Sequence, residues 1–553
     1  MTLFDIVLAL PLIGFLIAVI LPSGDLIKKF TLVLSLIVFI ASLGLIGPVL
    51  AKPGEMSFVT DTMWIASPKI TYHVGIDGLS LWLVILSTLL TPIAVLISWK
   101  YITHRLKEFY AFLLLLEFGL IGVFGALDLF LFYVFWEVSL VPMYFLVGIW
   151  GHERRIYAAV KFFLFTLAGS LLMLAAIIFL YLRADSFDYG TILTALQTGR
   201  MTLSHTEATL CFLAFFIAFA IKVPLFPLHT WLPDAHVEAP TAGSVMLASV
   251  MLKLGTYGLV RFCLPLFPVP AREHAPWIVA LAIVGIIYGA LVALVQPNMK
   301  KLVAYSSVSH LGFVVLGIFS FNQIALDGAV YQMLNHGIST GALFMLVGYL
   351  YERRHSLMIA DYGGVASLAP ALSAIFLLTT LASIGLPTLN NFVGEYLVLQ
   401  GSALVNFQWT VFAAVGVILS ACYMLWMYQR AFLGRYPGQV MESGHGHGGH
   451  GSAEPDTNAE VVAAGAHEGH ETHDHGHGGH GFHMPDLTLR EWIAIIPLVV
   501  LMVWMGMQPN TFLPSIGASN SKTLAAVERR TEQQVKAPTK APAVVAKEVE
   551  RAD

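Results

Sequence analysis

Residues 220–233 read A-I-K-V-P-L-F-P-L-H-T-W-L-P, an apolar stretch that contains one lysine and three prolines. A proline inside a helix removes a backbone donor and clashes with the preceding turn, so this stretch predicts a helix that breaks partway along. Residues 383–395, S-I-G-L-P-T-L-N-N-F-V-G-E, form a second stretch of this kind. Interrupted apolar helices at corresponding places in two halves are typical of membrane transporters that are built from inverted repeats.

The composition of the whole chain agrees with a position inside a membrane. Of its 553 residues, 57% are hydrophobic and only 12% are charged, and the mean hydropathy is +0.76. A bilayer core about 30 Å thick needs roughly 20 apolar residues per helix. We therefore expect an all-α polytopic membrane protein with about 14 transmembrane helices, the seventh and twelfth of which are broken. The expected helices span residues 3–22, 30–50, 79–99, 110–127, 129–150, 157–182, 209–232, 241–264, 276–296, 300–320, 325–350, 371–400, 408–434 and 490–512.

The spacing of the two breaks predicts how the chain is organised. The broken helices are five helices apart, which favours two inverted five-helix units, helices four to eight and helices nine to thirteen. The expected segments are 1–109 with the first three helices, 110–264 as the first unit, 276–434 as the second unit, 441–486 as a His/Gly-rich cytoplasmic loop, 490–512 as the last helix and 515–553 as a disordered tail.

Basic residues in the short loops predict the orientation of the helices, because lysine and arginine favour the cytoplasmic side. They gather in the loops after odd-numbered helices, for example at Arg154, Arg155, Lys300 and Lys301. We therefore expect both termini to lie on the non-cytoplasmic side.

Several classes of site are not indicated by the sequence. The three cysteines, Cys211, Cys263 and Cys422, lie far apart and have no C-x-x-C spacing, which predicts neither a disulfide framework nor an iron–sulfur cluster. There is no G-x-G-x-x-G fingerprint and no P-loop. We expect no cofactor and no metal in this chain, no nucleic-acid partner, and any redox chemistry to belong to other chains.

Four of the ionisable residues inside the expected helices stand out: Glu137, Lys222, Lys253 and Glu395. A charge at the bilayer centre costs roughly 3 kcal/mol on insertion scales, and such residues usually lie on ion paths. The alternative is that Glu137 and a lysine form a structural pair that joins two helices. Lys253 has no evident acidic partner in the sequence, and a buried lysine that can release its proton suits a proton relay.

Helices ten and eleven support this hypothesis independently. Each has polar residues at helical spacing, so that His310 and His336 each belong to a polar stripe. A polar stripe must face water or the protein interior, which favours a hydrated row that links Lys253, His310, His336 and Glu395. Ordinary hydrogen bonding between helices is the alternative interpretation.

Further polar residues are weaker candidates. His229 and His236 lie at the cytoplasmic end of helix seven and in the loop after it, where they could admit protons, although a capping or packing role fits equally well. Glu117 in helix four is a candidate of the same sort. Asp77, in V-G-I-D-G-L-S, is expected to cap the third helix.

The His-rich stretch within residues 441–486 contains S-G-H-G-H-G-G-H-G and T-H-D-H-G-H-G-G-H-G-F-H. Its imidazoles could bind transition metals, and this leaves a metal-handling transporter open as an alternative function. A Gly-His repeat of low complexity fits no single coordination geometry well. We therefore interpret the stretch as a loop insertion without a packed site.

Three stretches resemble a known family: F-W-E-V-S-L-V-P-M-Y-F-L-V-G-I-W-G-H-E-R-R at 135–155, K-V-P-L-F-P-L-H-T-W-L-P-D-A-H-V-E-A-P-T-A-G-S-V-M-L-A at 222–248, and L-P-T-L-N-N-F-V-G-E-Y at 386–396. They are similar to the antiporter-like chain M family of bacterial respiratory complex I, the NADH–quinone oxidoreductase. The resemblance runs from about residue 70 to residue 435 and covers the two expected units.

This resemblance implies a proton-translocating subunit that couples electron transfer from NADH to quinone in other subunits to proton pumping. It makes Glu137 and Lys222 the acid–base pair of the input half and Lys253 the central relay, with His310 and His336 on the connecting path. Glu395 is then the terminal carrier; the related chains L and N usually have lysine there.

The resemblance also implies a setting for the chain. It predicts the bacterial inner membrane, chains L and N as neighbours in the lipid bilayer, and FMN, iron–sulfur clusters and quinone in partner subunits. A subunit of a multisubunit cation/proton antiporter or of a membrane-bound hydrogenase is the main alternative. A purely structural spacer is a further alternative, but it leaves the buried lysines unexplained.

Overall fold

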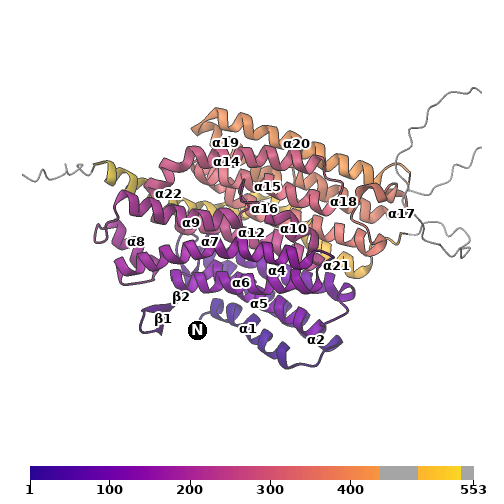
Figure 1. Ribbon diagram of the computed structural model, residues 1–553, viewed down its shortest axis with the longest axis horizontal. Helices are drawn as coiled ribbons and strands as arrows, with labels where there is room; N and C mark the ends of the chain where they lie inside the picture. The colour runs from indigo at the N-terminus through magenta and orange to yellow at the C-terminus, as the bar shows by residue number, and fades with distance from the viewer. Residues whose placement is uncertain (436–483, 537–553) are drawn as a thin grey trace, which may run out of the picture.

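The computed structural model describes residues 1–435 and 484–536, which form a bundle of long, roughly parallel helices (Figure 1). Within these residues, 13 helical spans are long and apolar enough to cross a membrane. The helices α18 (Pro370–Ser383) and α19 (Asn390–Val405) are each too short to cross alone, and together they make the fourteenth crossing. The expected number of crossings is therefore confirmed.

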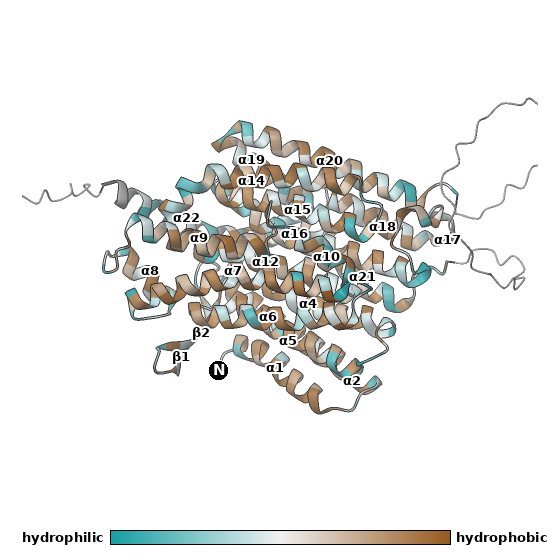
Figure 2. Cartoon of the chain, in the orientation of Figure 1, coloured by the Kyte–Doolittle hydropathy of each residue, from teal (hydrophilic) through white to brown (hydrophobic). Residues whose placement is uncertain are grey.

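The helices follow the apolar stretches of the sequence closely (Figure 2). The other crossings are, in chain order, α1 (Leu3–Ile20), α2 with α3 (Asp25–Leu43, Ile46–Ala51), α4 (Gly78–Tyr101), α5 (Leu106–Gly125), α6 (Leu129–Trp150), α7 (Arg155–Ala184), α9 (His205–Lys222), α11 to α13 (Thr241–Leu266), α14 (Pro268–Leu294), α15 (Met299–Phe319), α16 (Gln323–Arg354), α20 (Phe407–Phe432) and α21 (Leu489–Met507).

Both broken helices lie where the prolines predict them. The helix α9 stops at Lys222, and the chain becomes helical again at α10 (Trp231–Glu238). The Trp231 indole N–H donates to the carbonyl of Ile221 at 2.9 Å, which holds the two sides of this break together. In the second break, Gly385 has a φ of +77° between α18 and α19, a conformation that glycine adopts without a steric penalty.

The centre of the bundle consists of three crossings: α11 to α13, α15 and α16. The most apolar windows of α11–α13 and α16 are entirely buried, whereas α1, α2 and α20 have most of their residues at the outside. The central span α11–α13 includes two π-helical turns, Leu247–Met251 and Leu259–Cys263, on either side of α12 (Leu252–Gly258). Such turns are often found at functional sites.

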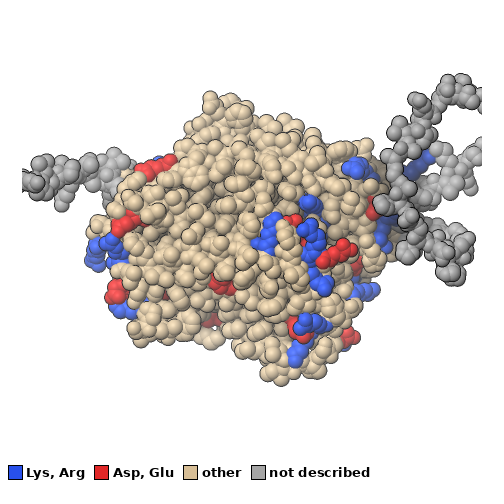
Figure 3. Space-filling model, viewed as in Figure 1, with Lys and Arg blue, Asp and Glu red and all other residues tan. Residues whose placement is uncertain are grey.

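Charged side chains lie mainly toward the two ends of the bundle. On the face in Figure 3 they gather at the left edge and over the right-hand part, and the area between them is almost uncharged. The N-terminus, α8 (Tyr189–Gln197) and α22 (Leu513–Lys536) lie near one end, and α17 (Val365–Leu368) lies near the other (Figure 1). This distribution fits helices that cross a bilayer from end to end.

The all-α prediction omitted a β-hairpin between the second and third crossings. The strands β1 (Ser57–Ile65) and β2 (Ile70–Ile76) pair antiparallel, with Ser57 opposite Ile76 and Ile65 opposite Ile70. Both strands are rich in β-branched and aromatic residues, which favour extended structure. The hairpin is too short to stand out in a chain whose hydropathy is dominated by membrane helices.

The prediction of a disordered tail from residue 515 is wrong for its first part, because α22 continues to Lys536. Ile516, Leu524 and Val527 are buried along one side of this helix, although its average composition is polar. Residues 537–553 lie outside the described residues, as do residues 441–483 of the expected His/Gly-rich loop. Asp486, just after them, accepts the N–H groups of Ala371 and Leu372 at the start of α18.

Candidate functional site

Lys253 and His336 meet in the centre of the bundle. Both residues are completely buried, Lys253 on α12 and His336 on α16. The Lys253 ammonium donates to the carbonyl of Ala248 at 2.5 Å and lies 2.7 Å from Nδ1 of His336. No ion pair joins Lys253 to a carboxylate within the described residues. The imidazole is therefore the side chain placed to accept its proton.

His310 and Glu395 form a second buried pair, which brings α15 and α19 together. Nδ1 of His310 lies 2.7 Å from Oε1 of Glu395, and both side chains are at most 5% exposed. Gln332 on α16 donates to the same carboxylate oxygen at 3.0 Å. These two contacts on one carboxylate oxygen hold Glu395 at the junction of α15, α16 and α19.

The two pairs join into one row because the two histidine rings are neighbours. Their centroids lie 5.9 Å apart at an interplanar angle of 59°. The order along the row is Lys253, His336, His310 and Glu395, so each histidine has a different charged neighbour. The sequence grouped these four residues, and the structure brings all four together from four separate elements.

Glycines permit the close approach of α19 to α16. A Cβ atom on Gly394 would lie 2.4 Å from Oε1 of Gln332 and 2.8 Å from Nδ2 of Asn335. Both distances are well below van der Waals contact, so a larger residue would push the amide of Gln332 away from Glu395. The glycine next to Glu395 in sequence therefore positions the donor on which this carboxylate depends.

Several polar atoms beside the row have no hydrogen-bond partner among the described residues. They include Nε2 of both His310 and His336, together with the hydroxyls of Ser249 and Thr340. A buried polar atom left unpaired costs about 1–3 kcal/mol, and buried water normally satisfies such atoms. Water beside the row would complete the connection between the two imidazoles, which no direct hydrogen bond joins among the described residues.

The predicted partners Glu137, on α6, and Lys222, at the end of α9, are not in direct contact. The Lys222 ammonium is buried without a hydrogen bond, 5.4 Å from the ring centroids of both Trp136 and Phe162. No ion pair between Lys222 and Glu137 occurs among the described residues, although the two side chains are close enough to interact electrostatically. Glu137 is partly exposed on the outside of α6, while one of its oxygens is buried and unpaired.

His229 and His236 have aromatic packing contacts. The ring of His236 stacks on Phe344 with a centroid distance of 4.5 Å, and that of His229 lies 5.1 Å from Tyr288. The nitrogens of both rings are buried without a hydrogen-bond partner in the part of the chain that the structure describes. Glu117 on α5 is likewise buried with both carboxylate oxygens unpaired. None of these three residues is hydrogen-bonded to the row within the described part of the chain.

Sequence reasoning missed Lys300, which it counted among the basic loop residues. Lys300 is only 4% exposed, and its ammonium donates to the carbonyls of Ala239 at 2.5 Å and Val237 at 3.3 Å. These carbonyls lie at the C-terminal end of α10, where a cation is favourable. The sequence could have marked Lys300 as unusual, because it lies in the first turn of its own helix, where a cation is unfavourable.

Arg261 is a second residue that the sequence did not single out. It forms a buried ion pair with Asp77 at 2.5 Å, and Asp77 also caps α4 as predicted. Burial by itself would raise the pKa of Asp77, but the neighbouring guanidinium outweighs burial and holds this pKa below its usual value. The sequence could have marked Arg261 as a buried charge, because it lies inside the apolar run Y-G-L-V-R-F-C.

Metal ligands do not gather in the described part of the chain. Within residues 1–435 and 484–536, no three His, Cys, Asp or Glu side chains are arranged to hold a metal ion. The His-rich stretch, which carried the alternative of a metal-handling protein, lies almost wholly outside these residues.

The chain is similar to one family of membrane proteins and to named relatives in bacteria. The family described as NADH:quinone oxidoreductase/Mrp antiporter, TM, matches residues 126–421. The NADH-quinone oxidoreductase subunit M of Rhodobacter capsulatus is 48% identical over 422 residues, which cover 75% of this chain and 82% of that protein. The subunit M of Rickettsia prowazekii is 41% identical over 87% of this chain and 89% of that protein.

A solved structure extends the likeness to the fold. A chain of respiratory complex I from Thermus thermophilus with bound NADH superposes with a TM-score of 0.80 at 30% sequence identity. The match covers 95% of this chain and 99% of that chain. The whole bundle, including its peripheral helices, therefore follows the arrangement in that complex.

Proposed function

Because this chain belongs to the NADH-quinone oxidoreductase subunit M family, we propose that its buried row from Lys253 to Glu395 is the path along which protons move. The chain is a proton-translocating membrane subunit of an oxidoreductase complex. The observation that carries the proposed path is the row itself, with contacts of 2.7 Å at both ends and adjacent imidazoles between them.

A proton can pass along this row in short steps. The Lys253 ammonium gives its proton to Nδ1 of His336 over 2.7 Å, and the imidazole then carries charge on both nitrogens. Water connects Nε2 of His336 to His310, because the two rings lie too far apart for a direct hydrogen bond. His310 passes the proton to Glu395, which becomes neutral when it accepts one.

Glu137 and Lys222 supply protons to the row in this proposal. A nearby carboxylate favours the charged form of a lysine, and separation of the two favours release of the proton. Lys222 has no hydrogen bond within residues 1–435 and 484–536, and Glu137 lies where a neighbouring subunit can cover it. A change in that neighbour would alter the distance between the two groups and so drive a proton toward Lys253.

The proposed organisation keeps the two units expected from the sequence, residues 110–264 and 276–434. His229 and His236 admit protons from the cytoplasm, and both termini lie on the other side of a bacterial inner membrane. The antiporter-like chains L and N are the proposed neighbours. FMN, iron–sulfur clusters and quinone belong to partner subunits, which supply the energy that this chain converts.

Replacing His310 with Phe tests the path at the residue that connects His336 to Glu395. The purified complex would be reconstituted into vesicles, and proton uptake would be measured per NADH oxidised. We expect a clear fall in this ratio, whereas NADH oxidation with an artificial acceptor at the peripheral site continues. His274→Phe is the matched control, because the His274 imidazole contacts the carbonyl of Pro270 and the rings of Phe212 and Trp277, all of which lie outside the row. An unchanged ratio in His310→Phe contradicts the proposal.

A further inference from the structure

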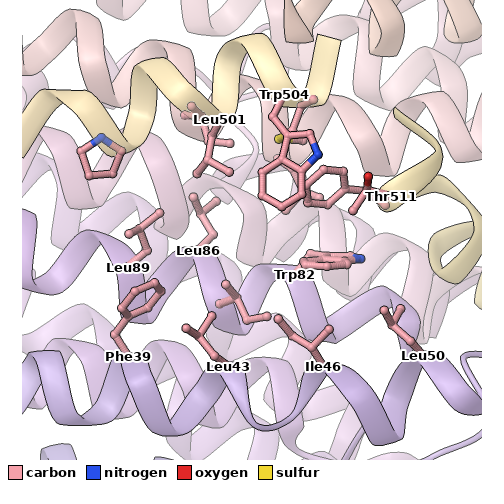
Figure 4. A pocket seen from close by; sticks show the side chains of 16 residues that line it. Phe39, Leu43, Ile46, Leu50, Trp82, Leu86, Leu89, Leu501, Trp504 and Thr511 are labelled. Atoms are coloured by element: carbon pink, nitrogen blue, oxygen red, sulfur yellow. The ribbon is translucent and has the colours of Figure 1, made fainter. Parts of the chain in front are cut away.

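An apolar groove runs along the outside of the bundle between elements that are far apart in the sequence. Its cavity has a volume of about 440 Å³, and all 16 residues that line it are uncharged. In Figure 4, Phe39 and Leu43 lie on one wall, formed by α2 and α3, and Leu501 and Trp504 lie on the opposite wall, formed by α21. Leu86 of α4 lies between the two walls.

This groove faces the surroundings of the bundle. Leu43 on one wall is 41% exposed and Trp504 on the other is 46% exposed. Atoms in protein interiors and in lipid tails normally pack in van der Waals contact with their neighbours. The side chains on both walls of an empty apolar groove lose the dispersion energy of these contacts. An elongated apolar molecule that fills the groove recovers this energy. The volume of the groove lies within the usual range for ligand sites.

Two lysines lie near the turn at one end of the groove. Leu50 lines that end, and Lys52 follows it directly after α3, with a side chain that is 72% exposed. Lys522 of α22 reaches the same turn, because a Cβ atom on Gly54 would lie 3.0 Å from its Cε. Ser519 fixes this approach by donating to the carbonyl of Pro53 at 2.8 Å.

The position of these lysines suits a phosphate group. The helix α3 ends at Ala51 and the hairpin strand β1 begins at Ser57, so the turn between them marks the edge of the membrane. Lysine side chains at such an edge attract the phosphates of lipid head groups. The nearby carboxylate of Glu55, 3.8 Å from Lys52, is able to meet the amine of a zwitterionic head group.

We propose that this groove binds one phospholipid, with an acyl chain between α2–α3 and α21 and its phosphate at Lys52 and Lys522. The lipid then joins the N-terminal helices of the chain to its last helices. The apolar walls explain the shape of the site, and the two lysines explain why the occupant carries an anionic phosphate. This site is separate from the row between Lys253 and Glu395.

Filling the groove tests this proposal. Leu43→Trp places an indole inside the groove, and Ile37→Trp on the same helix adds the same bulk at a position that is 48% exposed and does not line it. The full-length protein would be purified in mild detergent with its accompanying subunits, and native mass spectrometry would count the retained phospholipids. We expect Leu43→Trp to retain one phospholipid fewer per protein than Ile37→Trp.

The lysines are tested separately, so that the result does not depend on one bulky variant. The double variant Lys52→Ala/Lys522→Ala should lose the same lipid at a lower detergent concentration, whereas Lys29→Ala, an exposed lysine elsewhere, should not. Unchanged lipid retention in Leu43→Trp and in the double variant overturns the proposal. Loss of a quinone or of a partner subunit in place of a phospholipid also overturns it.

Discussion

Each ionisable residue of the central row is held by a residue from another helix. Lys253 contacts His336 of α16, and Glu395 contacts His310 of α15. Charges in a low-dielectric interior interact strongly with their neighbours, so a small displacement changes which group holds the proton. The spacing within the row is therefore the property that single substitutions should affect most.

Gly394→Ala should disturb this spacing without removing a polar group. Its new methyl group would meet Oε1 of Gln332 at 2.4 Å and displace the amide that donates to Glu395. We expect a destabilisation of about 1–3 kcal/mol, as for overpacking elsewhere, together with slower proton transport. Thermal unfolding and proton uptake by reconstituted vesicles measure the two effects. Gly47→Ala, where a Cβ atom meets nothing within 4 Å, is the control and should behave like the unchanged protein.

Asp77→Asn should destabilise the protein strongly, because it leaves Arg261 buried without its partner. Breaking a buried ion pair by removing one charge typically costs about 3–5 kcal/mol. Thermal unfolding of the purified protein measures this effect. Glu55→Gln, which removes the partner of an exposed lysine, should shift the midpoint little. Equal midpoints for the two variants would show that the pair between Asp77 and Arg261 contributes no special stability.

The residues of the row could be identified from the sequence, but which of them contact each other could not. Lys253 and Glu395 stand out because a charge in an apolar stretch is rare. The assignment of His336 to Lys253 and of His310 to Glu395 depends on how α15, α16 and α19 pack, which no local pattern specifies. Lys300 escaped notice because a lysine near a helix end resembles an ordinary loop residue.

At the scale of elements, the helix breaks could be predicted and the two smaller elements could not. Proline acts locally through its missing N–H, so α9 and α18 end close to the expected positions. The hairpin and α22 depend on distant contacts, such as the indole of Trp82 donating to Ser515 at 2.9 Å. Such contacts become visible only after the bundle has formed.

Val527→Asp should release α22 from the bundle. The side chain of Val527 is fully buried, and a carboxylate placed there without a partner costs several kcal/mol. We expect faster cleavage within residues 513–536 by a protease added to the purified protein. Glu528→Ala, an exposed position on the same helix, should be cleaved at the original rate. Equal cleavage of the two variants would mean that the buried face of α22 does not hold it in place.

The hairpin should be anchored in a pH-dependent manner through His73 and Asp188, which lie 2.6 Å apart. The hydrogen bond to Asp188 raises the pKa of His73 above its usual 6.5, and Asp61 and Asp128 act in the same direction against burial. Burial would raise the pKa of Asp188, but the bond to His73 holds it below 3.8. The contribution of His73 is complete below pH 6.5 and is lost as pH rises through its raised pKa, while that of Asp188 is lost only in acid.

Hydrogen exchange of the strand β2 measures this pH dependence. After correction for intrinsic exchange rates, protection of residues 70–76 should fall as the pH rises above 6.5 and passes through the raised pKa of His73. The variant His73→Gln should start with lower protection and show no such fall. Protection that rises with pH over this range, or a variant with the same profile as the unchanged protein, would contradict the assignment.

At the scale of the whole molecule, the fully buried crossings α11–α13 and α16 hold the row in the middle of the bundle. In the proposed path, protons reach this row along its polar side chains and the water beside them. A chain of respiratory complex I from Thermus thermophilus matches 95% of this chain, so the same fold of the bundle occurs in that complex.

The central claim is that protons cross this chain by way of Lys253. The most direct measurement is the number of protons transported per NADH oxidised by the complete complex in sealed vesicles, with Lys253→Met compared with Lys107→Met, which changes a lysine in the first turn of α5 outside the row. We predict a lower ratio for Lys253→Met and an unchanged ratio for Lys107→Met. Equal ratios for Lys253→Met and the unchanged complex would contradict the account.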